Sequence, residues 1–126
     1  MHRSRMYALI VDAPDRDAPQ AARFWSQALG VPARVDPAEP QFTSLAGAVD
    51  GLAVAVQSVD DAPRVHIDIE TDDVDAEVDR LVRLGATEVS QWLQCHVLKA
   101  PGGHLVCVIP VHSDPELFAA TARTWE

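Results

Sequence analysis

The sequence predicts an α+β fold built from two tandem βαβββ modules that together form a ligand cleft, followed by a short C-terminal helix. Three observations predict it. The order strand, helix, glycine stop and hairpin occurs twice, at a spacing of about 55 residues. Each expected helix ends at a Leu-Gly pair, at Leu29-Gly30 and at Leu84-Gly85. The apolar spacing changes from two residues to 3.6 at each strand-to-helix junction. We expect one domain over 1–126, with module one near 6–59, module two near 64–110 and a tail at 113–126.

The first module begins with an apolar strand at Met6–Asp12, which the turn-forming segment APDRDAP closes. A helix with one buried face follows, and both of its aromatic residues are expected in the core. Its apolar positions are Ala21, Phe24, Trp25, Ala28 and Leu29. Gly30 and Pro32 end this helix. Three short strands are then expected at Ala33–Val35, Phe42–Ala46 and Leu52–Val59.

The second module begins with the strictly alternating strand Arg64–Thr71. A helical stripe follows, with acidic residues in its first turn and arginines in its last turns, as the helix dipole favours. The stripe consists of Val74, Val78, Leu81 and Val82. Gly85 ends the helix, and strands are expected at Thr87–Gln91, Gln94–Lys99 and His104–Ile109.

The tail begins with Ser113–Glu116, which combines a capping side chain, a proline and an acid in the order typical of a helix start. One helical face would carry Leu117, Phe118, Thr121, Ala122 and Trp125. This helix is expected to cover an exposed part of the sheet. A lid or a dimer contact is the alternative.

Charge excludes several classes of partner. The chain has 10 Lys and Arg against 19 Asp and Glu, a formal net charge of −9. This balance argues against nucleic acids and anionic membranes. No apolar run approaches the ~20 residues of a membrane span, and MHRSRM does not look like a signal sequence. Cys95 and Cys107 make no disulfide framework, so a cytoplasmic protein with free thiols is expected.

Three segments together resemble the vicinal oxygen chelate superfamily, which includes glyoxalase I, bleomycin-resistance proteins and extradiol dioxygenases. They are VDAPDRDAPQAARFWSQALG, RVHIDIETDDVDAEVDRLVRLGAT and APGGHLVCVIP, in the order that the superfamily has. The likeness is greatest to its glyoxalase-like subgroup. It implies paired βαβββ modules around a cleft, a small-molecule ligand and a homodimer.

The resemblance also implies where a divalent metal would be bound. The second-module histidine of the superfamily falls on His66, but its first-module counterpart falls on Ala8. The closing-strand glutamate falls on Cys107, and its first-module counterpart on Ala55, with Gln57 two residues on. One histidine does not make a site for a hard divalent ion. The usual metal triad is therefore expected to be lost, so no cofactor is expected; a divalent metal bound through His66 is the alternative.

The alternating strand places His66, Asp68 and Glu70 on its non-core face, and Asp12 occupies the position equivalent to Glu70. These residues would form a polar cleft wall, in which a carboxylate could fix a cation or act as a general base. A solvated strand face is the alternative, since any one-sided sheet alternates in this way.

The hairpin register around Cys107 stays open. If Lys99 pairs with His104, then His96 lies opposite Cys107, and His66, His96 and Cys107 offer an N₂S set for zinc or copper. A shift of one residue instead puts Cys95 opposite Cys107.

We therefore predict a glyoxalase-like protein that binds or sequesters a natural product or metabolite. Its cleft would be lined by His66, Asp68, Glu70, Gln57, His96, Cys107 and Asp12. The first alternative is a metal-dependent lyase, isomerase or dioxygenase with a rebuilt metal site. The second is a dimer whose cleft is filled by its own side chains. The sequence identifies no catalytic residue, and whether the protein is an enzyme stays open.

Overall fold

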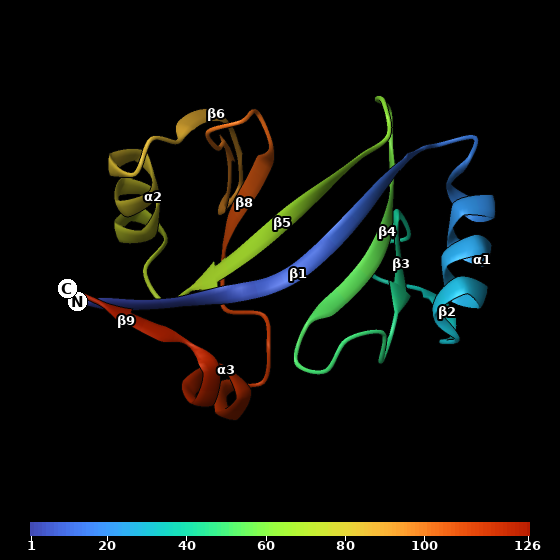
Figure 1. The fold of residues 1–126 in the computed structure, drawn as a ribbon, viewed down its shortest axis with the longest axis horizontal. Helices are drawn as coiled ribbons and strands as arrows, with labels where there is room; N and C mark the ends of the chain where they lie inside the picture. The colour runs from blue at the N-terminus through green and yellow to red at the C-terminus, as the bar shows by residue number, and fades with distance from the viewer. The chain divides into compact units, whose positions relative to one another are not determined.

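The computed structural model describes residues 1–126 and contains nine strands and three helices (Figure 1). The chain divides into two compact units, a first unit of Ala8–His66 and a second unit that combines Met1–Tyr7 with Ile67–Glu126. The long strand β1 (His2–Pro14) therefore contributes to both units. The α+β class predicted from the repeated pattern is confirmed.

The first unit contains one helix and four strands, in the order β2-β3-β4-β1. Its other elements are α1 (Ala18–Leu29), β2 (Ala33–Val35), β3 (Phe42–Leu45) and β4 (Ala53–Val59). β1 and β4 pair in parallel, and the other neighbours are antiparallel. Helix α1 packs against β3 and β4 (Figure 1). This is the predicted βαβββ module, and the bounds of β2, β3 and β4 agree with the predicted bounds to within one residue.

The second unit repeats this arrangement, in the order β1-β5-β8-β7-β6. Its elements are β5 (Arg64–Thr71), α2 (Val74–Arg83), β6 (Thr87–Trp92), β7 (Cys95–Lys99), β8 (Leu105–Pro110), α3 (Pro115–Thr121) and β9 (Arg123–Trp125). β5 and β8 pair in parallel, as β1 and β4 do. The Asp73 side chain accepts a hydrogen bond from the Ala76 amide and caps α2, and the expected stripe residues Val74, Val78 and Leu81 pack into the core.

The buried face of α1 differs from the predicted one. Ala22 is buried and Ala18 and Ala21 pack beside it against the sheet, whereas Phe24 is 60% exposed and Trp25 36%. The expectation that both aromatic residues belong to the core is wrong. The three alanines let the backbone of α1 lie close to β3 and β4. The rings of Phe24 and Trp25 instead contact each other edge to face, with centroids 5.1 Å apart.

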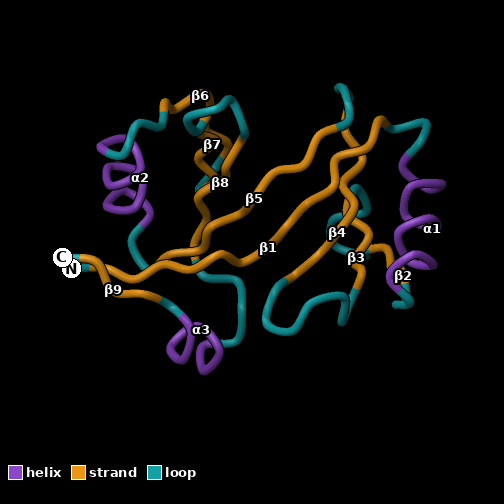
Figure 2. Tube along the Cα trace, viewed as in Figure 1, coloured by secondary structure: helices purple, strands orange, loops and turns teal.

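The tail begins as predicted and ends differently. Helix α3 has Pro115 in its first turn, but it ends at Thr121, and Ala122 is extended. Residues Arg123–Trp125 form β9, which pairs antiparallel with His2–Ser4 at the start of β1 (Figure 2). The helical face predicted to reach Trp125 is therefore too long, because the polar start of β1 offers backbone groups that the tail satisfies as a strand.

No helix of the structure is long and apolar enough to cross a membrane; the longest, α1, has 12 residues.

Candidate functional site

The sheet of the first unit has one face covered by α1 and one face turned away from it. Val54 and Val56 pack under the helix, so their neighbours on β4 point to the other face. The parallel register places Asp12 beside Gln57 and Ile10 beside Ala55 on that face. The two polar residues singled out in this module therefore lie side by side.

Asp12 and His66 form a buried pair on this open face. Asp12 is 6% exposed and His66 is 9% exposed, and Nδ1 of His66 lies 2.9 Å from Oδ2 of Asp12. The second carboxylate oxygen of Asp12, Oδ1, is buried without a hydrogen-bond partner. A buried acceptor left unsatisfied costs roughly 1–3 kcal/mol, and more when it is charged. Oδ1 of Asp12 is therefore an acceptor that no group of the protein satisfies.

Asp68 and Cys107 lie beside each other on β5 and β8, on the face opposite α2. Their side chains bring together one oxygen and one sulfur donor, a combination that suits zinc better than magnesium or calcium. A hydrogen bond with Cys95, burial and the nearby Asp68 carboxylate raise the pKa of the Cys107 thiol. Because metals bind the thiolate, this environment opposes metal binding.

Glu70 is completely buried and its carboxylate is fully engaged. Its Oε1 accepts the backbone amides of His112 (2.7 Å) and Ser113 (2.9 Å), and its Oε2 accepts Nη1 of Arg5 (2.9 Å) and the Ser113 hydroxyl. Burial alone raises the pKa of Glu70, but the hydrogen bonds from Ser113, His112 and Arg5 outweigh it and hold the pKa below its ordinary 4.5. Glu70 thus anchors the segment between β8 and α3.

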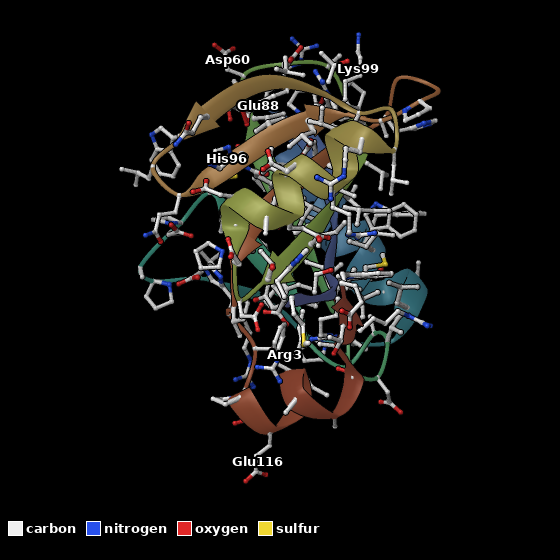
Figure 3. The ribbon with its side chains drawn as sticks, turned by 90° about the vertical axis from the view of Figure 1, so that its left-hand side faces the viewer. Arg3, Asp60, Glu88, His96, Lys99 and Glu116 are labelled. Atoms are coloured by element: carbon white, nitrogen blue, oxygen red, sulfur yellow. The ribbon has the colours of Figure 1, made fainter.

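The structure places His96 on the face of β7 opposite to Cys107. Val97 pairs with Cys107 and Lys99 with Leu105, so both predicted registers are wrong. The β7–β8 loop is one residue longer than expected, because two positive-φ glycines, Gly102 and Gly103, let it close between Ala100 and His104. Nδ1 of His96 instead lies 2.5 Å from the Glu88 carboxylate of β6 (Figure 3). The N₂S set that included His96 does not form.

A family model described as a glyoxalase-like domain matches residues 8–109. The chain belongs to this glyoxalase-like family. It is therefore a member of the vicinal oxygen chelate superfamily, as the three sequence segments indicated. No curated protein matches the sequence.

Solved structures share the fold of this glyoxalase-like domain at low sequence identity. A Legionella pneumophila protein described as an NAD-dependent benzaldehyde dehydrogenase has a TM-score of 0.60 at 9% identity, over 83% of this chain and 98% of its own. Methylmalonyl-CoA epimerase from Mycobacterium tuberculosis has a TM-score of 0.51 at 15% identity, over 90% of this chain and 91% of its own. A single-residue variant of the Streptomyces coelicolor methylmalonyl-CoA epimerase, bound to 2-nitronate-propionyl-CoA, has a TM-score of 0.53 at 18% identity. This match covers 86% of this chain and 98% of its own. These likenesses show the fold.

Sequence reasoning missed two residues beside the open face of the second unit of this glyoxalase-like domain. Arg5 precedes the predicted strand Met6–Asp12, in the polar segment HRSR, whereas Tyr7 lies within that strand but was not assigned to a site. Burial, followed by the carboxylates of Glu70 and Asp68, raises the pKa of the Tyr7 phenol. Tyr7 therefore remains a hydrogen-bond donor at neutral pH.

Proposed function

We propose that this glyoxalase-like domain binds a small organic molecule on the open face around Asp12, without a metal at the superfamily's usual positions. The observation that carries the proposal is the buried Oδ1 of Asp12, which has no hydrogen-bond partner in the protein. Protein interiors seldom leave such an acceptor unsatisfied, and exceptions often mark functional positions. A ligand that donates a hydrogen bond would satisfy it.

The side chains around Asp12 support a ligand without a metal. The positions that resemble first-module metal positions hold Ala8 and Ala55, whose methyl groups cannot bind an ion. The His66 ring already contacts the Asp12 carboxylate through Nδ1. The superfamily's first-module ligands are therefore replaced by a small apolar surface.

The neighbouring residues indicate what kind of molecule fits. Gln57 lies between Asp12 and Phe42 in the sheet, so a carboxylate, an amide and an aromatic ring follow one another across three neighbouring strands. Alanines at 53 and 55 leave room on the same face. We infer a ligand with an apolar or aromatic body and a cationic or amide nitrogen, such as a metabolite or natural product that the protein carries or sequesters. One structural relative, a methylmalonyl-CoA epimerase, is described in complex with methylmalonyl-CoA, which supports ligand binding by this fold.

Isothermal titration with benzamidine tests the proposal, since this probe joins an aromatic ring to a cationic nitrogen donor. We expect benzamidine to bind the natural protein with a millimolar or lower Kd. The affinity should fall about tenfold in Asp12→Asn, which removes the negative charge. Asp50→Asn is the matched control, because Asp50 lies in an exposed turn. Equal binding by all three proteins, or no binding to any, would contradict the proposal.

A metal-dependent activity is the second candidate, and the neighbouring Asp68 of β5 and Cys107 of β8 favour it. Asp68 would hold zinc through an oxygen and Cys107 through a sulfur, and zinc would supply Lewis-acid chemistry when bound. Elemental analysis of protein purified without chelators tests this candidate, with His66→Ala and Cys107→Ser alongside. About one zinc per chain, lost in both variants, would favour it over metal-free binding.

A cytoplasmic homodimer completes the proposal. The superfamily resemblance supports the dimer, and the small number of cysteines, two in the whole chain, supports a reducing compartment. Light scattering is expected to give twice the chain mass of 13.7 kDa. A mass of one chain at micromolar concentration would contradict the dimer.

A further inference from the structure

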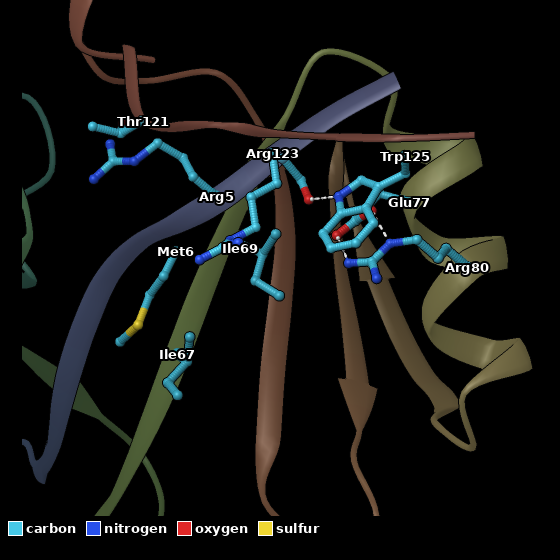
Figure 4. Close-up of a pocket in the computed structure, with 10 residues that line it drawn as sticks. Arg5, Met6, Ile67, Ile69, Glu77, Arg80, Thr121, Arg123 and Trp125 are labelled. Carbon is cyan, nitrogen blue, oxygen red and sulfur yellow. Dashed lines mark hydrogen bonds and ion pairs between the residues drawn. The ribbon is translucent and has the colours of Figure 1, made fainter. Parts of the chain in front are cut away.

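A cavity lies in the second unit, on the side of β5 that faces α2, and the Asp12 face has no part in it. Its volume is about 450 Å³, within the usual range for sites that hold small organic ligands. Its floor is apolar and consists of Met6, Ile67 and Ile69, with Trp125 of β9 forming one wall (Figure 4). Met6 is 40% exposed and Ile67 37%, so this floor is accessible from solvent.

The Trp125 wall is held in place from two sides. Its Nε1 donates a hydrogen bond of 2.8 Å to Oγ of Ser4, and the Arg80 guanidinium lies 3.8 Å from the centre of its indole ring. Arg80 in turn makes two hydrogen bonds of 2.8 Å to the fully buried Glu77. A fixed aromatic wall loses little conformational entropy when a ligand binds against it.

Of the three arginines that line this cavity, two are paired with carboxylates and one is not. Glu77 neutralises Arg80, and Glu70 accepts a hydrogen bond of 2.9 Å from Arg5. Arg123 is exposed and makes no ion pair in the structure, and its side chain reaches from β9 over the apolar floor toward Ile69 and Met6 (Figure 4). The Arg123 guanidinium is therefore available to pair with an anionic ligand above this apolar floor.

We propose that this cavity binds a small organic monocarboxylate, with its apolar body on the floor between Met6 and Ile67 and its carboxylate on Arg123. The planar guanidinium fork matches a carboxylate in two parallel hydrogen bonds. The apolar floor gives the ligand a hydrophobic contribution that an inorganic anion lacks. The cavity exists because the tail forms strand β9 and not a longer helix, which gives the tail a binding role.

Two-dimensional amide NMR with 1-naphthylacetate tests this assignment, and 1-naphthylacetamide is the probe of the same shape without the charge. We expect the acid to shift the amide signals of Ile67 and Ile69 and the indole signal of Trp125. The neutral amide is expected to bind about tenfold more weakly, and the acid is expected to bind Arg123→Gln more weakly by the same factor. Arg83→Gln removes the same charge from the exposed end of α2 and is expected to bind the acid normally.

Two further variants make the result decisive. Met6→Glu places a negative charge on the accessible floor and is expected to abolish binding of the acid. Asp12→Asn is expected to leave it unchanged, so failure here is distinguishable from failure at the Asp12 face. Equal binding of acid and amide, an unaltered affinity in Arg123→Gln, shifts confined to other residues, or no shifts at all would overturn the assignment.

Discussion

Replacing Glu70 by glutamine is expected to destabilise the fold strongly, because Glu70 receives four hydrogen bonds in a fully buried position. Arg5 and Ser113 donate to Oε2, and the amides of His112 and Ser113 donate to Oε1. A glutamine amide can satisfy only one of these two sides. Its NH₂ group would face donors on the other side, and the Arg5 guanidinium would lose its buried counter-charge.

The size of the effect follows from these contacts. Breaking a buried ion pair by removing one charge costs roughly 3–5 kcal/mol. The exposed end of the cluster allows some rearrangement, so we expect about 3 kcal/mol for Glu70→Gln. At about 4 °C per kcal/mol for a chain of this length, the melting temperature should fall by about 12 °C.

Thermal unfolding at several pH values is the assay, with Glu116→Gln as the exposed matched control on α3 (Figure 3). The pKa of Glu70 is lower in the folded than in the unfolded chain, so its contribution is complete above 4.5 and is lost as the pH falls through the folded pKa. The difference in free energy of unfolding between the natural protein and Glu70→Gln should therefore be widest near neutral pH and should narrow as the pH falls below 4.5. A gap below about 1 kcal/mol at pH 7, or one that widens in acid, would refute this reasoning.

Three other substitutions test separate parts of the fold. Leu98→Ala empties a fully buried position in the core under α2 and should cost about 3 kcal/mol in urea unfolding; a cost below about 1 kcal/mol would mean that this core is loosely packed. Asp73→Ala removes the side-chain cap of α2 and should cost about 1 kcal/mol, with Asp79→Asn on the same helix as the neutral control. Trp125→Phe removes the hydrogen bond to Ser4 and should cost about 1 kcal/mol and speed amide exchange in β9; unchanged exchange would show that the bond does not hold the strand.

The modules were predictable because their signals are local. Alternation predicted β5 at its observed bounds of Arg64–Thr71, and the Leu-Gly stops predicted where α1 and α2 end. Gly30 adopts φ 70° and donates its amide to the Ser26 carbonyl, a helix end that glycine makes without strain. The open-face position of Asp12, Asp68 and Cys107 also follows from strand alternation.

The remaining features depend on contacts between distant segments. The strand at Arg123–Trp125 exists because His2–Ser4 lies beside it, and nothing in the tail alone distinguishes a strand from one more helical turn. Glu70 and Asp12 occupy equivalent positions in the two modules, yet the tail satisfies the Glu70 carboxylate and nothing in the protein satisfies Oδ1 of Asp12. The two carboxylates differ only in their distant partners, which no local pattern shows.

A crystal structure of the protein soaked with benzamidine would test the central claim most directly. The account predicts density for the probe on the open face of the first unit, with an amidine nitrogen within hydrogen-bond distance of Oδ1 of Asp12. Density for a buried water that fully satisfies Oδ1, with no probe on this face, would contradict it.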